Sequence, residues 1–143
     1  MNDIIAPAPE KVAIVLAADL AVGHAANVAA CVAAGLAGAR PGWAGKPLAD
    51  AAGLRSHASS HHPITVLRAE PAAMAVLMAR LTEAPQDGAM CLFPAYAQQM
   101  HDGTAYQARH GTMDHRLEPL LAIGLAGSKR WVNRLTGSMP LYR

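Results

Sequence analysis

The residues with the clearest capacity for chemistry lie where a buried apolar run gives way to an alanine-rich segment. Asp19 lies at the end of "KVAIVLAADL", and His24 and Asn27 follow it in "AVGHAANVAAC". A carboxylate and an imidazole can transfer protons, and an asparagine side chain both donates and accepts hydrogen bonds. On a helix, His24, Asn27 and Cys31 would share one face. Asp19, His24 and Asn27 are therefore candidate ligand-binding residues, and His24 is also a candidate catalytic residue.

Each of these residues also has a purely structural interpretation. The side chain of Asn27 can hydrogen-bond the backbone of a neighbouring loop and so order that loop. His24 can be a solvated residue of the first helical turn. Asp19 can accept hydrogen bonds from the N–H groups of the turn. Cys31 has no cation or second cysteine near it in sequence to activate its thiol, which favours a small core residue. An asparagine within an alanine helix costs about 0.5 kcal/mol in helix propensity, which either role must offset.

A second polar group lies in "AQQMHDGTAYQARHGTMDHRL", residues 97–117. His101 beside Asp102 offers an imidazole that a carboxylate can orient, and Thr104 and Tyr106 offer hydroxyl groups. Asp102 is therefore a candidate catalytic residue, and His101 and Thr104 are candidate ligand-binding residues. The alternative is a solvated loop, because adjacent loop residues often point apart.

The remaining histidine cluster is "SHASSHH", residues 56–62. His57 and His61 have a spacing that suits a metal ion when it occurs on a helix. The serines and Pro63 oppose a helix here, and no cysteine or carboxylate completes a ligand set. We expect no metal site and no cofactor.

Glycine, proline and polar residues divide the chain into the elements that must position these groups. Residues 1–10 are expected to be a flexible lead-in, and residues 11–143 a single domain. The β-branched run at 11–16 and the apolar runs at 63–69, 89–96 and 118–127 predict four strands. Alanine-rich or amphipathic runs predict helices at 24–38, 48–54, 71–84 and 129–137. The segment 97–117 is predicted as a long loop with a helical turn around Tyr106, and 138–143 as an edge segment. This order predicts an α/β fold of three layers, with helices on both faces of a four-stranded mixed sheet.

Composition limits the function further. Hydrophobic residues make up 52% of the 143 residues and aromatic residues only 4%, so small side chains should bring helices close to the sheet. A net charge of +2 does not support RNA binding. The two cysteines have no CxxC spacing and are expected to be reduced and buried. We expect no membrane segment and no secretory leader, and therefore a soluble cytoplasmic protein.

Two stretches, "KVAIVLAADLAVGHAANVAACVAAGL" and "LLAIGLAGSKRWVNRLTGSMPLYR", lie at the two ends of the predicted domain. The first resembles the opening strand, turn and alanine-rich helix of the type II peptidyl-tRNA hydrolase superfamily, and the second resembles its closing strand, helix and tail. A closer resemblance is to an uncharacterised bacterial family, domain of unknown function two-thousand. Its pattern is matched by "DL..G...N" at 19–27, "FP" at 93–94, the polar loop around 104–106 and "VNRLTGSMPLYR" at 132–143. The resemblance implies a peptidyl-tRNA hydrolase II-like fold and, since that superfamily forms homodimers, a homodimer.

The same resemblance argues against peptidyl-tRNA hydrolysis. The hydrolases use a lysine in the turn, a histidine on the first helix and an aspartate after the third strand. The lysine position falls on His24, and the histidine position falls on Cys31 or Ala33, depending on the register. The aspartate corresponds to Asp102. Since neither the lysine nor the histidine is present, the hydrolase activity is not expected here.

Three classes of function stay open. The chain can be an enzyme such as a hydrolase, with a site that combines the two groups of candidate residues at the carboxyl ends of the strands. It can be a small-ligand or nucleotide-binding module, because a helix N-terminus at the same place favours an anionic group. It can also be a structural or regulatory dimer that associates through apolar surfaces.

Overall fold

The computed structural model of the protein describes residues 8–143, so most of the predicted lead-in at residues 1–10 lies outside the described residues. Along the chain the elements are β1 (Lys11–Ala17), α1 (Val22–Ala39), β2 (Pro47–Ala49), β3 (Arg55–His57), β4 (Ile64–Ala69), α2 (Pro71–Arg80), β5 (Ala89–Pro94), the short 3-10 helix η1 (Ala95–Gln99), α3 (Gly103–His110), β6 (Leu120–Gly127) and α4 (Lys129–Thr136). This mixture of helices and strands confirms the predicted α/β class.

Four strands form one mixed sheet, as predicted, and their order in it is β4-β1-β6-β5. β1 is parallel to β4, with Val12 opposite Ile64, whereas β6 is antiparallel to both β1 and β5. Strands β1, β4 and β5 therefore point the same way. Their carboxyl ends meet at one edge of the sheet, which we call the carboxyl edge, and the chain enters β6 at this same edge.

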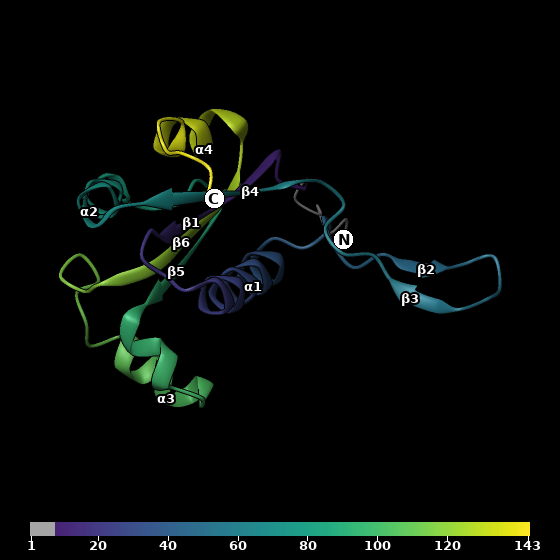
Figure 1. Ribbon diagram of the computed structural model, residues 1–143, viewed down its shortest axis with the longest axis horizontal. Helices are drawn as coiled ribbons and strands as arrows, with labels where there is room; N and C mark the ends of the chain where they lie inside the picture. Colours follow the sequence, from purple (N-terminus) through teal and green to yellow (C-terminus); the bar gives the residue numbers. More distant parts are fainter. Residues whose placement is uncertain (1–7) are drawn as a thin grey trace, which may run out of the picture.

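The two faces of the sheet are covered differently. Helices α2 and α4 pack on one face and α1 packs on the other, which gives the three predicted layers (Figure 1). Alternate residues of β1 enter the two cores, with Ala13 and Val15 on the α2 side and Val12 and Ile14 on the α1 side. Both faces of β1 are buried, which explains its continuous apolar sequence.

Helix α1 approaches the sheet closely because β6 carries a glycine beneath it. A Cβ atom added at Gly124 would overlap Val32 and would lie 2.9 Å from Leu36 Cδ1. The side chains of Val32 and Leu36 are completely buried. The small residues of the chain thus produce the close helix-to-sheet contact predicted from the composition.

The helices begin at signals that are visible in the sequence. Ser128 Oγ accepts a hydrogen bond from the N–H of Trp131 and caps α4, and Pro71 occupies the first turn of α2. The predicted apolar stripe of α2 is buried. It consists of Met74, Leu77, Met78 and Leu81, the last of which is the C-cap residue.

The C-terminal tail extends the sheet beside β4, as predicted for an edge segment. The N–H of Arg68 donates to the carbonyl of Pro140, and the N–H of Tyr142 donates to the carbonyl of Val66. Leu67 and Leu141 form an isolated antiparallel bridge between them.

The prediction of a helix at residues 48–54 is wrong, because β2 and β3 form a two-stranded hairpin there. Asp50 Oδ1 accepts hydrogen bonds from the N–H groups of Ala52 and Leu54, at 2.8 and 2.9 Å. Gly53 has a φ of 86°, which a glycine adopts without strain. An aspartate that binds the backbone ahead of it, followed by such a glycine, favours a chain reversal over a helix.

The polar segment 97–117 contains more helix than predicted. Helix α3 spans Gly103–His110, where the sequence predicts only a helical turn. Asp102 Oδ1 caps this helix by accepting hydrogen bonds from the N–H groups of Thr104 and Ala105.

Helix α1 is long and apolar enough to cross a membrane, although no membrane segment is expected from the sequence. One side of the helix packs on the sheet, as in the core helix of an α/β protein. Its buried residues are Ala25, Val28, Val32 and Leu36. Cys31 is exposed, so the predicted burial of this cysteine is wrong. Cys91, in β5, is partly buried.

Candidate functional site

Two hydrogen bonds hold the turn between β1 and α1 at the carboxyl edge. The N–H of Ala18 donates to the carbonyl of Ala69 at the end of β4, at 3.0 Å. The hydroxyl of Tyr142, in the C-terminal tail, donates to the carbonyl of Leu20 at 2.9 Å. Asp19 lies between these two anchors and is exposed. Its position is therefore set by both the sheet and the tail.

A cavity of about 250 Å³ opens beside Asp19, and we call it the edge crevice. Its walls come from the ends of β1 and β4, from α2 and from the segment that enters β6. The lining residues are Ala17, Asp19, Ala69, Pro71, Met74, Ala75, Met78, Arg116, Glu118, Pro119, Leu120 and Leu121. The crevice thus combines an apolar wall on α2 with two carboxylates and one guanidinium group.

Backbone contacts position Arg116. Its Nη2 donates to the carbonyl of Leu81 at 2.7 Å, and its N–H donates to Asp114 Oδ1 at 3.0 Å. The first bond ties the segment before β6 to the end of α2. It also uses part of the hydrogen-bonding capacity of the guanidinium group, which leaves less of it for a ligand.

A cluster of aromatic and histidine side chains adjoins the crevice. The hydroxyl of Tyr96 and Nε2 of His115 are hydrogen-bonded at 2.7 Å, and the rings of His110 and His115 stack with centroids 4.0 Å apart. Tyr106 packs edge-on against His110, and the guanidinium group of Arg109 lies 4.5 Å from the centre of the Tyr96 ring. These contacts join η1, α3 and the segment before β6.

Burial and neighbouring charges perturb the acid–base behaviour of this cluster. The pKa of His115 is lowered, first by burial and then by the nearby His110, while Glu118 and Asp114 act in the opposite direction. The pKa of Tyr96 is raised by burial; the nearby Arg109 acts in the opposite direction, and Glu118 adds to the rise. Glu118 therefore lies close enough to act on both His115 and Tyr96, which links the cluster to the edge crevice. At pH 7, His115 is a neutral imidazole able to accept a proton.

The pKa of Tyr106 is raised most by burial, and the charges of Tyr96 and Cys91 raise it further. The pKa of Cys91 is raised by burial and by the nearby Cys31. Residues of α3, β5 and α1 therefore approach one another on the α1 face.

The predicted site residues lie in different places. Asp19 lines the edge crevice. His24 is half-buried near the beginning of α1, and Asn27 is exposed on the side of α1 that faces away from the sheet. Asp102 caps α3, and His101 and Thr104 are exposed beside it. None of these five residues lines the edge crevice with Asp19.

Sequence reasoning missed Arg116, Glu118 and His115. The order of the strands indicates which further polar residues reach the site. Because β6 is antiparallel to β1, the residues just before β6 arrive at the edge where β1 ends. Polar residues that precede an antiparallel strand are therefore candidates alongside those that follow the parallel strands.

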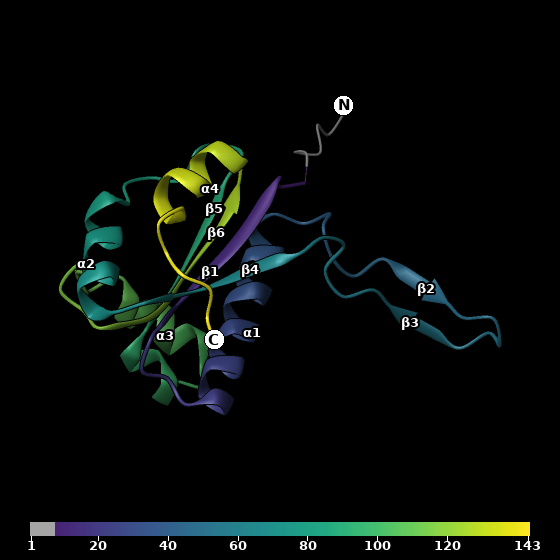
Figure 2. The same ribbon diagram turned by 45° about the horizontal axis from the view of Figure 1, so that its top comes forward.

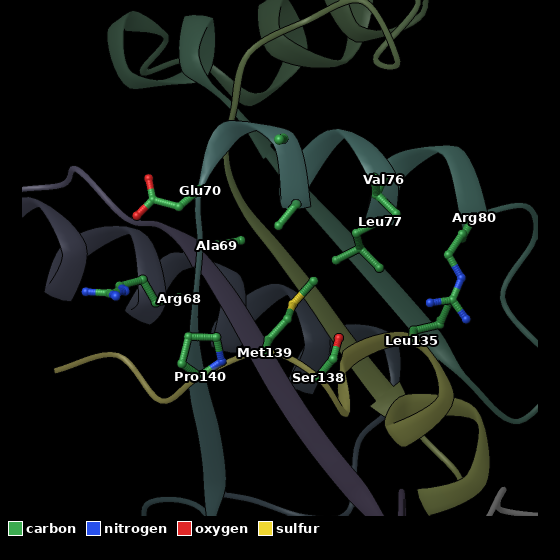
Figure 3. A pocket seen from close by; sticks show the side chains of 12 residues that line it. Arg68, Ala69, Glu70, Val76, Leu77, Arg80, Leu135, Ser138, Met139 and Pro140 are labelled. Carbon is green, nitrogen blue, oxygen red and sulfur yellow. The ribbon is translucent and has the colours of Figure 1, made fainter.

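A larger hollow of about 440 Å³ lies on the other side of α2, between this helix and the C-terminal tail (Figure 3). Met139, Leu77 and Val76 line its middle, while Arg68 and Glu70 point away from it at one end. Because its polar groups do not converge, the edge crevice is the better candidate site. Among residues 8–143, no group of three or more His, Cys, Asp or Glu residues could hold a metal ion.

The sheet order and the placement of the helices define a three-layer α/β protein with a crevice at the carboxyl edge. The chain belongs to the family DUF2000, described as proteins of unknown function, whose pattern matches residues 10–143. The solved structure of a protein of unknown function, Atu0240, from Agrobacterium tumefaciens strain C58 is similar, with a TM-score of 0.81 and 22% sequence identity. The match covers 93% of this chain and 97% of that chain, and it shows a shared fold. No curated protein matches the sequence.

Proposed function

We propose that this protein binds a small molecule in the edge crevice. The observation that carries the proposal is the convergence of Asp19, Arg116 and Glu118 around a cavity with an apolar wall. In sheets with parallel strands, ligands bind beyond the carboxyl ends, where connecting loops meet. A mostly apolar cavity with a few converging polar groups is the usual form of a small-molecule site.

The charges around the crevice favour a ligand with a positively charged or hydrogen-donating group. Two acidic residues, Asp19 and Glu118, line it, whereas the guanidinium group of Arg116 already donates to the carbonyl of Leu81. The apolar wall of Met74 and Met78 suits a hydrocarbon part. The ligand class is therefore a small amine with an apolar body. An anionic ligand at the beginning of α1, the other candidate class from the sequence, would lie beside the negative charge of Asp19.

Thermal-shift and calorimetric titrations with hexylamine and leucinamide test the proposal, and hexanoate is the negative probe. We expect the amines to stabilise the wild type and to lose affinity in Asp19→Asn and Glu118→Gln. Each loss should be about 10-fold, since a hydrogen bond to a charged group contributes about 1.5–3 kcal/mol. Asp87→Asn changes a carboxylate outside the crevice and should bind as the wild type does.

A second pair of variants tests the cavity itself. Ala75 lies on the exposed side of α2 and lines the crevice, whereas Ala79 lies on the same helix and does not. Ala75→Trp should fill the crevice and abolish binding, while Ala79→Trp should leave it unchanged. If an amine binds all these variants with equal affinity, the crevice is not the ligand site.

One observation favours a second candidate, an acid–base enzyme at the same place. His115 is hydrogen-bonded to Tyr96, and its pKa is lowered, so it is a positioned proton acceptor beside the crevice. For an enzyme of this kind, His115→Gln should retain ligand binding and lose turnover of the bound compound. Binding without turnover in the wild type favours the binding module.

We further infer a peptidyl-tRNA hydrolase II-like fold without that activity, in a cytoplasmic protein. The element order and the motifs at both ends support the fold, and His24 and Cys31 or Ala33 at the hydrolase positions argue against the reaction. Purified protein should therefore leave N-acetyl-aminoacyl-tRNA intact. Sustained cleavage at a rate above buffer would contradict this inference.

A further inference from the structure

The fold brings together the two cysteines of the chain, which lie far apart in the sequence. Cys31 is on α1 and Cys91 is on β5, and α1 packs against β5 on its face of the sheet. Figures 1 and 2 show this helix on the opposite side of the sheet from α2 and α4. Cys91 pairs with Gly124 of β6, the residue that α1 crosses. Cys91 therefore lies at the level of the middle of α1.

Gly35 leaves an opening on α1 that the side chain of Cys91 occupies. A Cβ atom at Gly35 would lie 3.0 Å from Cys91 Sγ and 3.9 Å from Cys91 Cβ. A glycine inside a helix is less favourable than an alanine, and it allows another group to approach the backbone closely. Gly35 is exposed and Cys91 is partly buried, so the sulfur lies near the surface. The thiol of Cys91 thus lies against the backbone of α1.

Cys31 lies one helical turn before this opening. Residues four apart share a face of a helix, with Cβ atoms about 5–6 Å apart. A side chain at position 35 would tilt toward the turn that holds Cys31, and Cys91 Sγ fills part of the space that it would take. Cys31 also adds to the raised pKa of Cys91, which agrees with this proximity. The two thiols are therefore neighbours on one side of α1.

The separation of α1 and β5 suits a disulfide between them. Disulfide-linked Cβ atoms are about 3.5–4.5 Å apart. The position of a Cβ atom at Gly35 is 3.9 Å from Cys91 Cβ, which is within this range. Cys31 lies one turn away, so a bridge from it requires rotation of both cysteine side chains and a small movement of α1.

The two thiols differ in their access to solvent. Cys31 is exposed, whereas Cys91 lies partly buried beside α1. Burial raises the pKa of Cys91 above its ordinary value of 9.0, so at pH 7 this residue is a neutral thiol. An oxidant in solution should therefore react with Cys31 first, and Cys91 is placed to react with the product.

We propose that Cys31 and Cys91 form a reversible disulfide when the protein meets hydrogen peroxide. The sulfur of Cys31 attacks one oxygen of the peroxide, the O–O bond breaks, and the other oxygen leaves as water with the thiol proton. The sulfur of Cys91 then attacks the sulfur of the Cys31 sulfenic acid. The S–O bond breaks, and hydroxide leaves as water with the Cys91 proton. Two thiols are oxidised to one disulfide, and one peroxide is reduced to two water molecules.

The bridge would make α1 and β5 a redox-sensitive contact. Disulfides of cytosolic proteins are usually transient and redox-sensing, which agrees with the cytoplasmic location inferred above. Fast reaction with Cys91 protects Cys31 from the sulfinic and sulfonic acids, which thiols do not reduce. A thiol reductant then restores both cysteines.

Peroxide treatment of the reduced full-length chain in the presence of dimedone tests the proposal. Dimedone traps a sulfenic acid that no second thiol attacks. We expect the wild type to lose the mass of two hydrogens and to yield, after proteolysis, a linked pair of peptides that contain Cys31 and Cys91. Dithiothreitol should restore the original mass. Cys91→Ser should instead carry several-fold more dimedone on Cys31 than the wild type does.

A matched control moves the exposed thiol around α1. Cys31→Ser combined with Ala34→Cys keeps one exposed cysteine on the helix, but on a different side of it from Gly35. This variant should carry dimedone at position 34 and form no bridge to Cys91. Cys31→Ser alone should be oxidised several-fold more slowly than Cys91→Ser, because it lacks the exposed thiol. Circular dichroism of each variant confirms that it is folded, and Cys91→Ala repeats the comparison with a smaller side chain.

Three results would overturn the proposal. In the first, the wild type carries as much dimedone on Cys31 as Cys91→Ser does. In the second, the disulfides of the wild type link two chains instead of two residues of one chain. In the third, the cysteine introduced by Ala34→Cys pairs with Cys91 as readily as Cys31 does. A bridge within the wild-type chain, together with dimedone adducts in Cys91→Ser and in the control, supports the proposal.

Discussion

The two faces of the central sheet are built from different side chains. The α2/α4 face is packed with large residues such as Trp131, Leu77 and Met74, and two helices cover it. The α1 face is covered by one alanine-rich helix that approaches the glycine of β6, and its core combines small residues with Leu36 and Trp43. Large side chains fill space between separated elements, whereas small ones allow the elements to touch. Close contact with the sheet therefore distinguishes the α1 face at the point where α1 crosses Gly124.

The hollows beside α2 belong to the first face. The edge crevice is one of them, and Asp19, Glu118 and Arg116 line it together with apolar residues of α2. On the second face, the outer side of α1 carries no Asp, Glu, Lys or Arg residue. The crevice and the outer side of α1 therefore lie on different faces of the sheet.

The largest expected effect comes from removing the main large side chain of the α2/α4 face. Trp131 is buried, and its ring approaches Gly88 and Gly127, two positions that leave room for it. Trp131→Ala should lower the free energy of unfolding by about 3–5 kcal/mol, because it leaves a cavity that two glycines cannot fill. Urea denaturation followed by circular dichroism measures this loss. A loss below 1 kcal/mol would show that this face does not depend on large side chains.

On the α1 face, adding atoms between helix and sheet should lower the free energy of unfolding. Gly124→Ala places a methyl group against the buried side chains of Val32 and Leu36, so α1 must move away from the sheet. We expect a loss of about 1–3 kcal/mol in the same denaturation experiment. Gly38→Ala adds the same methyl group to α1 where no atom lies within 4 Å, and it should be neutral or stabilising. Equal effects at the two glycines would contradict the close-contact description of this face.

The helices and strands that form the layers can be predicted from the sequence, because short stretches of sequence determine them. The continuous apolar run of β1, Pro71 at the start of α2 and Ser128 before α4 each act within a few residues. The hairpin at β2 and β3 was missed because its alanines favour a helix, while the decisive contacts are those of the Asp50 side chain and the φ angle of Gly53. At this site the turn contacts outweigh the helix propensity of the alanines.

The residues of the candidate site are harder to predict from the sequence, because the order of the strands decides which of them come together. Asp19 could be placed at the end of a strand from the sequence alone. Arg116 and Glu118 could not be placed beside it, since this requires that β6 lie next to β1 and run antiparallel to it. The exposure of Cys31 was missed for a related reason. In an alanine-rich helix, the sequence does not show which side faces the sheet.

A smaller effect should come from α3, in the segment that connects β5 to β6. Asp102 accepts two hydrogen bonds from backbone N–H groups at the beginning of this helix. Asp102→Ala should lower the free energy of unfolding by about 1 kcal/mol, and Asp102→Asn, which can still cap a helix, by much less. Urea denaturation compares the two variants. If Asp102→Asn costs as much as Asp102→Ala, the carboxylate has a role other than capping.

The smallest expected effect is a dependence of stability on pH that originates at His115. Folding lowers the pKa of this imidazole below its ordinary value of 6.5, so at pH values between the two the unfolded chain binds more protons than the folded one. The free energy of unfolding should therefore fall as the pH drops below about 6.5, until the folded pKa is passed, and should be insensitive to His115 above about pH 7.5. His115→Gln removes the titrating group and should flatten this part of the profile.

Urea midpoints of the wild type and His115→Gln, measured from about pH 8 to about pH 5.5, give the difference between the two profiles. Parallel profiles would mean that His115 is solvated in the folded protein. The stacking against His110 provides an internal check, because His110→Phe keeps an aromatic ring and removes the neighbouring charge. In that variant the loss at low pH should be smaller than in the wild type but still present, since burial is the larger cause of the lowered pKa of His115.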